Sequence, residues 1–228
     1  MIYIKFNDGI QEKINRLGDD LKIIEINGLP DSGCTLTAIH LSQYFKSDFV
    51  LYLGLKYKTS ESAIISYYFD SLDKSLIVYL QDSFEDENTL LKCVKEWGAF
   101  LDTIIIDDAA LFLLYKSKAR IKSFFSILRS LAIKMNLRII VINQVRFNLN
   151  IPLNTKRRVS IFERFRGLYS DYTANLIDLS LRVYKNEEES SDIFVAENIT
   201  KELLRIKNNS PRLKLNLSSG LKSLIMRL

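Results

Sequence analysis

Hydrophobic residues in the first two thirds of the chain gather in short continuous runs, which amphipathic segments separate. The continuous runs predict strands at residues 23–27, 49–54, 76–80, 103–107 and 137–143, preceded by a short alternating strand at 1–6. The amphipathic segments predict helices at residues 9–21, 34–45, 60–69, 86–100 and 116–135. Continuous apolar strands that alternate with helices are typical of a parallel sheet covered on both faces, so the pattern predicts an α/β fold.

The pattern changes after residue 144. Residues 146–170 have no clear period and predict a loop with one short helix. Further on, apolar and polar residues alternate, which predicts strands at 177–184, 199–206 and 212–217, with a polar turn at 185–192. The last third therefore predicts an antiparallel β extension of the parallel sheet. No linker or repeat interrupts the sequence, so we interpret residues 1–228 as a single domain.

The strand at residues 23–27 leads into a segment with the frame of a phosphate-binding loop. The frame G-x-x-x-x-G-K-[ST] is met at Gly28, Gly33 and Thr35, but Cys34 occupies the lysine position. In such a loop, backbone N–H groups and the following helix N-terminus hold the phosphates, the lysine reaches the β- and γ-phosphates, and the Ser/Thr hydroxyl binds magnesium. The sequence predicts weak ATP and Mg²⁺ binding without fast hydrolysis; a tight strand–helix turn without a ligand is the alternative.

A carboxylate ends the strand at residues 103–107. Asp107 stands where a second carboxylate orients magnesium in phosphate-loop enzymes, whereas Asp108 is a candidate cap of the next segment. A hydrolase also needs a group that polarises the attacking water, in many such folds a glutamate just beyond the second strand. The corresponding segment here has Lys56 and Lys58, and no carboxylate occurs between the end of this strand and Glu61. A second catalytic part is therefore missing, and we predict no catalytic residue.

Two side-chain amides follow one another where the fifth strand ends. An amide at Asn143 or Gln144 can sense a γ-phosphate and pass the signal to the following loop. The alternative is that the side chain caps the end of the strand. Both roles remain open at the level of the sequence.

The loop after Gln144 carries most of the excess positive charge. Its cations are Arg146, Lys156, Arg157, Arg158, Arg164 and Arg166, against the single acid Glu163. Aromatic residues are interleaved with them: Phe147, Phe162, Phe165 and Tyr169. Basic side chains neutralise phosphates and aromatic rings stack on bases, so the segment predicts binding of single-stranded DNA. A solvated loop with a buried phenylalanine face is the alternative.

Composition narrows the range of functions. The 228 residues carry a net charge of +5 and no apolar run of about 18 residues, the length that a membrane span needs. Cys34 and Cys93 are too few for a disulfide framework, which favours a reducing intracellular compartment. His40 is the single histidine, which argues against a Ser-His-Asp triad or a zinc site. We predict no metal site made by protein ligands alone, and we place Cys93 and His40 in the packing of the core.

The predicted segments occur in a recognisable order, and the chain resembles the ATPase core of RecA-family recombinases over nearly its whole length. The matching segments are N-G-L-P-D-S-G-C-T, L-I-V-Y-L-Q-D-S-F-E-D-E-N, L-D-T-I-I-I-D-D-A-A-L and L-R-I-I-V-I-N-Q-V-R. The tail R-I-K-N-N-S-P-R-L-K-L-N-L-S-S-G-L is similar to the closing β-hairpin of the family. The resemblance implies a RecA fold with Gly28, Gly33 and Thr35 at the phosphate, Asp107 at magnesium and Gln144 as nucleotide sensor. It also implies that the loop at residues 146–166 faces DNA.

The departures from the family pattern suggest a supporting role. The missing lysine and glutamate make the chain similar to recombinase paralogues of eukaryotic mediator complexes, including the Shu type. That resemblance implies a non-catalytic protein that assists the recombinase in homologous recombination and DNA repair. Its expected partners are another RecA-like paralogue or a small adaptor protein, the recombinase and single-stranded DNA, in the nucleus if the host is eukaryotic and otherwise in the cytoplasm. An active DNA-dependent ATPase and a purely structural partner are the rival interpretations.

Overall fold

The computed structural model describes residues 3–6, 14–15, 17–28, 32–54, 76–79, 87–109, 113, 116–144, 173–185 and 193–198. The predicted helix at residues 60–69, the basic loop and the predicted strands at 199–206 and 212–217 lie outside these residues. Most of the segment at 9–21 does so as well; the 3₁₀ helix η1, Gly18–Asp20, is described near its end.

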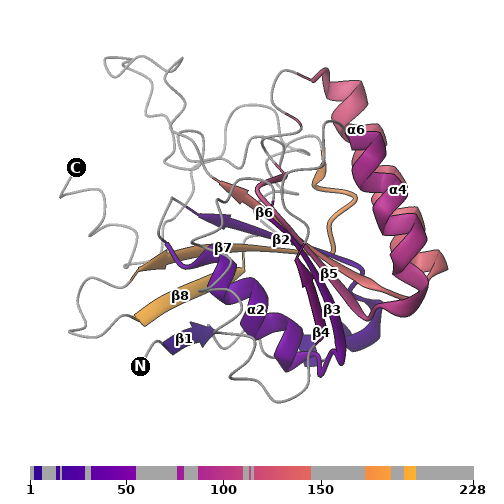
Figure 1. Ribbon diagram of the computed structural model, residues 1–228. Coiled ribbons are helices and arrows are strands. Elements are labelled where there is room, and N and C mark those ends of the chain that lie inside the picture. The colour runs from indigo at the N-terminus through magenta and orange to yellow at the C-terminus, as the bar shows by residue number, and fades with distance from the viewer. Residues whose placement is uncertain are drawn as a thin grey trace, which may run out of the picture.

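One sheet of eight strands runs through the described residues (Figure 1). Its order is β1-β8-β7-β2-β6-β5-β3-β4. The strands are β1 (Tyr3–Phe6), β2 (Ile23–Gly28), β3 (Phe49–Gly54), β4 (Leu76–Tyr79), β5 (Thr103–Asp107), β6 (Arg138–Gln144), β7 (Leu179–Lys185) and β8 (Ile193–Asn198). All neighbouring pairs are parallel except β7 with β8, which confirms the predicted α/β class with a mostly parallel sheet.

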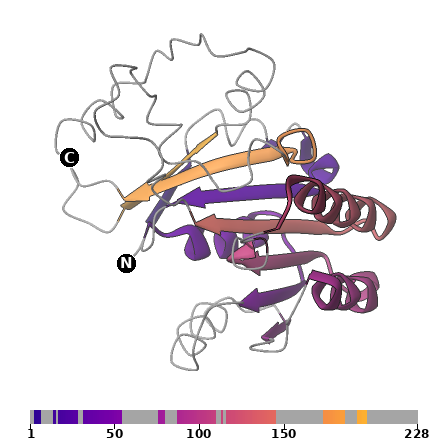
Figure 2. The ribbon, with the colours of Figure 1, turned by 90° about the horizontal axis from the view of Figure 1, so that it is seen from above.

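The described helices cover the two faces of this sheet. Helix α2 (Cys34–Tyr44) packs on one face; α4 (Glu87–Trp97), followed by η2 (Gly98–Phe100), and α6 (Lys118–Lys134) pack on the other (Figures 1 and 2). The first face buries residues such as Ile24, Ile26 and Ile39, and the second buries Ile104 and Phe125. Because a central strand is buried on both faces, its sequence is a continuous apolar run, as in I-I-I-D of β5.

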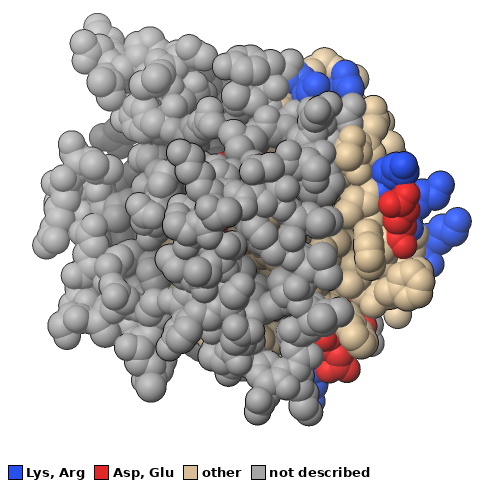
Figure 3. Space-filling model, in the orientation of Figure 1, with Lys and Arg blue, Asp and Glu red and all other residues tan. Residues whose placement is uncertain are grey.

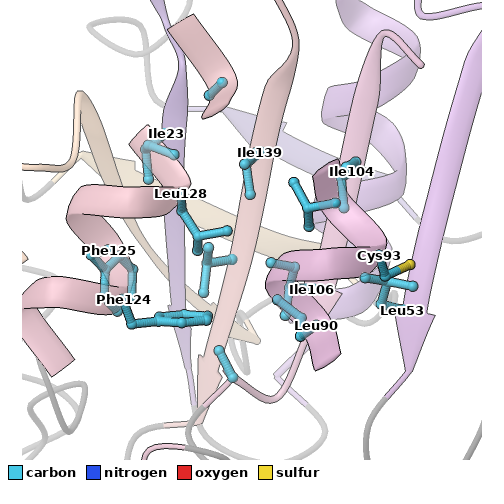
Figure 4. Packing of buried hydrophobic residues seen from close by; sticks show 14 of the residues in the cluster. Ile23, Leu53, Leu90, Cys93, Ile104, Ile106, Phe124, Phe125, Leu128 and Ile139 are labelled. Carbon is cyan, nitrogen blue, oxygen red and sulfur yellow. The ribbon is translucent and has the colours of Figure 1, made fainter. Parts of the chain in front are cut away.

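The core under α4 and α6 interlocks side chains from both helices and four strands. Figure 4 shows the labelled residues of this cluster: Ile23, Leu53, Leu90, Cys93, Ile104, Ile106, Phe124, Phe125, Leu128 and Ile139. The rings of Phe124 and Phe125 meet edge to face, with centroids 5.6 Å apart. Cys93 lies in this core, as its sequence context predicts.

One carboxylate fixes α6 to the start of the central strand. Oδ2 of Asp178 accepts the backbone N–H groups of Lys22 and Ile23 at 2.9 Å each, and its Oδ1 pairs with Nη2 of Arg129 at 2.7 Å. Nη1 of Arg129 also donates to the carbonyl of Leu176 at 2.9 Å. These bonds join α6, β2 and the segment before β7 at the amino edge of the sheet.

The C-terminal strands differ in part from the prediction. The strand predicted at 177–184 is β7, but it lies parallel to β2 and continues the parallel sheet. The antiparallel partner is β8, which the alternating pattern did not indicate; it pairs with β7 on one side and parallel to β1 on the other. Because β7 runs in the same direction as β2, the antiparallel extension begins one strand later than expected, at β8.

Candidate nucleotide site

The predicted site residues meet at the carboxyl edge of the central strands. Gly28 ends β2, Asp107 ends β5 and Gln144 ends β6, and β6 lies between the other two strands. Gly28 pairs directly with Gln144, while Asp107 is level with Ile142. In open parallel sheets, ligands bind outside the carboxyl ends of the strands, so this edge is where a ligand is expected.

Gly28 is required because the chain is crowded where the loop leaves β2. A Cβ atom at this position would lie 2.2 Å from Oγ of Ser32, 2.4 Å from Sγ of Cys34 and 2.8 Å from the backbone oxygen of Val183. Real Cβ atoms do not approach other atoms so closely, and the backbone of β7 has no rotamer by which to move away. Ser32, Cys34 and the backbone of β7 therefore leave no room for a side chain at position 28.

Gly33 leads into helix α2 and provides no side-chain cap for the helix N-terminus. Its φ of 85° lies in the left-handed region, which residues other than glycine rarely adopt. As N-cap it has no side chain to accept the first-turn N–H groups, and the first turn contains no acidic residue. Its own carbonyl accepts the N–H and the hydroxyl of Thr37, both at 2.9 Å. Because no N-cap side chain takes the first-turn N–H groups, they favour an anion at this point together with the helix dipole.

Thr35 and Asp107 are in direct contact although they are 72 residues apart in the sequence. The sequence predicts that they share a magnesium ion. The Thr35 hydroxyl donates to Oδ2 of Asp107 at 2.7 Å. A hydroxyl has one hydrogen and two lone pairs; with the hydrogen committed to Asp107, the lone pairs remain for a cation. Magnesium takes oxygen ligands and is commonly bound by one or two protein groups together with substrate phosphates. The residues therefore fit a magnesium ion that arrives with a nucleotide.

A buried tyrosine that the sequence interpretation missed joins this pair. Tyr52 of β3 is fully buried, and its hydroxyl also donates to Oδ2 of Asp107. The sequence signal is a single polar aromatic residue in the apolar strand F-V-L-Y-L-G. Tyr52 is two residues before Gly54, which pairs with Asp107 in the sheet, and this register brings the ring diagonally under the carboxylate.

Cys34 contributes no positive charge at the lysine position. Its Sγ lies 3.3 Å from Oγ of Ser32, under the start of the loop. Burial raises the pKa of the Cys34 thiol to about 12, the Ser32 hydrogen bond lowers it to a smaller extent, and the nearby Asp107 carboxylate raises it further. At neutral pH the side chain is therefore a neutral thiol, which neither balances a phosphate charge nor acts as a nucleophile.

The two amides at the end of β6 have different surroundings. The Asn143 side chain is buried and donates to Oε1 of Glu25 at 2.7 Å, so it belongs to the packing between the strands. For Gln144 the structure describes the backbone, which lies beside Gly28. The role of Gln144 as nucleotide sensor stays a prediction with a suitable position.

Glu25 is a buried carboxylate that the sequence interpretation did not single out. Besides Asn143, it accepts the hydroxyl of Ser180 at 2.8 Å, and Ser180 accepts the amide of Asn27 at 3.1 Å. The cluster links β2, β6 and β7 just before β2 and β6 reach the site. The signal in the sequence is the pair of polar letters in I-I-E-I-N, which point to the same face of the sheet.

A second cluster of charges joins helices α4 and α6. Glu87, buried at the start of α4, accepts a hydrogen bond from Nε of Arg120 and lies 3.6 Å from Nζ of Lys116. Burial raises the pKa of Glu87, but a backbone hydrogen bond and the two cations outweigh it and hold the pKa below its ordinary value. Figure 3 shows basic and acidic side chains on the right, on the part of the surface that the structure describes.

Several predicted residues lie outside the described part of the chain. These are Lys56, Lys58 and Glu61, and the DNA-binding candidates Arg146, Lys156, Arg157, Arg158, Arg164 and Arg166. Within the described residues, no group of three or more His, Cys, Asp and Glu side chains is placed to hold a metal ion. No described helix is long and apolar enough to cross a membrane.

Comparison with known proteins supports the fold. No protein-family model matches the sequence, and no curated protein matches it. Among solved structures, the chain is similar to a KaiC-like protein of the hyperthermophilic archaeon Pyrococcus horikoshii OT3, with a TM-score of 0.50 and 11% identity. The match covers 78% of this chain and 77% of the archaeal chain. KaiC-like proteins have the RecA-like fold, so the chain has a RecA-like fold.

Proposed function

We propose that this protein binds a nucleotide weakly, together with Mg²⁺, and does not hydrolyse it at a useful rate. The observation that carries the proposal is the Thr35–Asp107 hydrogen bond in the first turn of α2, whose N-cap Gly33 supplies no side-chain cap. The backbone N–H groups supply phosphate contacts, Thr35 supplies an oxygen to the metal, and Asp107 holds Thr35 in the orientation that the metal needs. A magnesium ion held there would screen charge on the phosphates.

The same site lacks what phosphoryl transfer requires. In a phosphate-loop enzyme the lysine neutralises charge on the transferring group, and Cys34 is a neutral thiol at that position. Between the end of β3 and Glu61 the sequence has no carboxylate that could serve as the water-polarising glutamate of the family. Groups of this kind act by stabilising the transition state, and each loss of about 1.4 kcal/mol of that stabilisation lowers the rate tenfold. We therefore expect the absence of both groups to remove most of the catalysis.

The biological role that we propose is that of a recombinase paralogue. Such a protein supports homologous recombination and DNA repair as one subunit of a heteromeric complex that assists the recombinase filament. The RecA-like fold and the segments that resemble the family support this role, as does the degenerate phosphate loop. The partner is another RecA-like paralogue or a small adaptor protein, and the complex acts in the nucleus if the host is eukaryotic.

The basic loop gives the proposed complex its contact with DNA. Six cations and interleaved aromatic residues between Arg146 and Tyr169 match what a single strand offers, phosphates along the backbone and exposed base faces. The loop follows Gln144 directly, so a nucleotide at the carboxyl edge of β2 and the DNA contact would be neighbours along the chain. Binding by the isolated protein is expected to be weak and to fall with rising salt.

An active DNA-dependent ATPase is the second candidate, because the Thr35–Asp107 pair is intact. Phosphate release with and without single-stranded DNA separates the two. We expect turnover at background level for the unmodified protein and for Cys34→Lys, since the second catalytic group stays absent. DNA-stimulated turnover that Thr35→Ala abolishes would favour the ATPase instead.

Sedimentation tests the complex. The protein should form a stable heterodimer with a co-expressed RecA-like or adaptor partner, and its melting temperature should rise in the complex because the partner binds the folded state. A monomer whose melting temperature is unchanged by every candidate partner, or a long homopolymer on DNA, would contradict the proposed assembly.

A further inference from the structure

We propose that Tyr52 is a positioning residue for the magnesium site, and that its hydroxyl holds the Asp107 carboxylate so that Thr35 faces the metal. This inference rests on the proposed nucleotide binding. It assigns a role to a side chain that neither the phosphate-loop frame nor the resemblance to RecA-family proteins indicates.

The register of the sheet gives Tyr52 its reach. Gly54 pairs with Asp107 and Tyr52 pairs with Ile105, so Tyr52 and Asp107 point to the same face, the one under α2. Thr35 approaches the carboxylate from the first turn of α2. Asp107 is therefore held between a helix residue on one side and a strand residue on the other, and both donate to the same oxygen, Oδ2.

The hydroxyl groups of Thr35 and Tyr52 have different positions at that oxygen. Thr35 lies in the first turn of the helix that begins the phosphate site, whereas Tyr52 is fully buried behind the carboxylate. A nucleotide-bound ion can therefore meet Thr35 while Tyr52 stays behind Asp107. By donating to Oδ2, Tyr52 fixes the rotation of the carboxylate, and the carboxylate in turn directs the Thr35 hydrogen away from the metal.

Packing alone does not account for a tyrosine here. The neighbours of Tyr52 in the core under α2 are mostly aliphatic, among them Val50, Ile105 and Ile140. A phenylalanine would fill the same volume without the cost of burying a hydroxyl, and a buried tyrosine hydroxyl needs a polar partner. The hydroxyl finds that partner in Asp107, the residue that the site needs held in place.

The test compares Tyr52→Phe with a matched control on strand β5. Thr103→Val removes another buried hydroxyl, the one that bonds Ser47 at 2.7 Å, from the opposite end of the strand that carries Asp107. The dissociation constant of a fluorescent ADP analogue is measured for the full-length protein with Mg²⁺ and with a chelator. The ratio of the two constants is the gain in affinity that magnesium supplies.

We expect Tyr52→Phe to reduce the magnesium gain about three- to tenfold, part of the value of one hydrogen bond to a charged group. Its affinity without magnesium should stay within about twofold of the unmodified protein, because the backbone N–H groups are untouched. Thr103→Val should leave the magnesium gain unchanged even though it lowers stability. Folding of each variant is checked by its denaturation midpoint.

The outcomes separate the inference from the function on which it rests. A Tyr52→Phe protein with the full magnesium gain, or one that loses affinity equally with and without magnesium, would overturn the positioning role and leave nucleotide binding in place. An unmodified protein that binds no nucleotide in either condition would overturn both. Should Tyr52→Phe fail to fold, Tyr52→Trp and Asp107→Asn are compared in the same assay, and a full magnesium gain in both would overturn the inference.

Discussion

Replacing Glu25 by glutamine tests whether a buried ionised carboxylate ties together the strands that build the site. Oε1 of Glu25 accepts a hydrogen bond from Asn143 at 2.7 Å, and Oε2 accepts one from Ser180 at 2.8 Å. Glutamine keeps the volume but has one oxygen, and its NH₂ group is itself a donor. One of the two donors therefore loses its bond to the side chain at position 25, which costs about 1.5–3 kcal/mol for a bond to a charged group.

Urea denaturation of the unmodified protein, Glu25→Gln, Ser180→Ala and the double variant measures this cost. We expect Glu25→Gln to lower the free energy of unfolding by about 2 kcal/mol, within the range for a lost charged hydrogen bond. In the double variant the costs should fall short of additivity by about 1 kcal/mol, because residues in one hydrogen-bond network couple. In the double variant the NH₂ group of the introduced glutamine no longer faces the hydroxyl that Ser180 carries in the unmodified protein.

A loss below about 0.5 kcal/mol in the free energy of unfolding for Glu25→Gln, the size of an ordinary surface change, would contradict the role of an ionised Glu25 in this cluster. A glutamic acid that is protonated in the folded protein already carries a donor, so glutamine would then replace it at little cost. Additive effects of the two single variants would likewise contradict the network. In either case the cluster would not be what holds β2, β6 and β7 in register near the site.

Three further predictions follow from the loop and its surroundings. Gly28→Ala should destabilise the protein by about 1–3 kcal/mol, since the added Cβ meets the fixed backbone of Val183. Gly98→Ala should cost less, because the flexible ends of the Met135 and Leu137 side chains can move. Thermal melts of the two variants measure the difference. The pKa of Cys34 is raised from 9.0 to about 12, so its contribution to stability is complete below pH 9 and is lost as pH rises toward 12; denaturation midpoints of Cys34→Ala should fall less over this range than those of the unmodified protein. Arg157→Glu with Arg158→Glu should weaken single-stranded DNA binding by the assembled complex and flatten the plot of log affinity against log salt, and an unchanged slope would place the DNA contact elsewhere.

The parallel core was predictable from the sequence because each buried strand leaves a continuous apolar run. The predicted bounds of β3 and β5 agree with the structure at both ends, and α4 and α6 differ from their predicted ranges only near their ends. The loop frame predicts Thr35 at magnesium, the end of an apolar strand predicts Asp107 there, and the two side chains are in contact. Sequence spacing combined with strand order was enough to bring them to one edge.

Other features depend on pairings that a local pattern does not encode. The direction of β7 is set by its neighbour β2, about 150 residues away in sequence, and alternation of side chains is the same in either direction. Tyr52 is the single polar residue of its apolar strand, and Glu25 is one of two in β2. Only the register shows that Tyr52 meets Asp107 and that Glu25 meets Asn143. Their roles come from cross-strand contacts, which no one-dimensional period reveals.

Equilibrium dialysis of the full-length protein against ATP and Mg²⁺ in the presence of single-stranded DNA tests whether the protein binds ATP without hydrolysing it, because it reports both how much nucleotide is bound and whether it is still ATP. We expect saturable binding of intact ATP that magnesium strengthens and that Thr35→Val weakens. Conversion of the ATP pool to ADP by the protein, or the absence of saturable binding at every concentration reached, would contradict it.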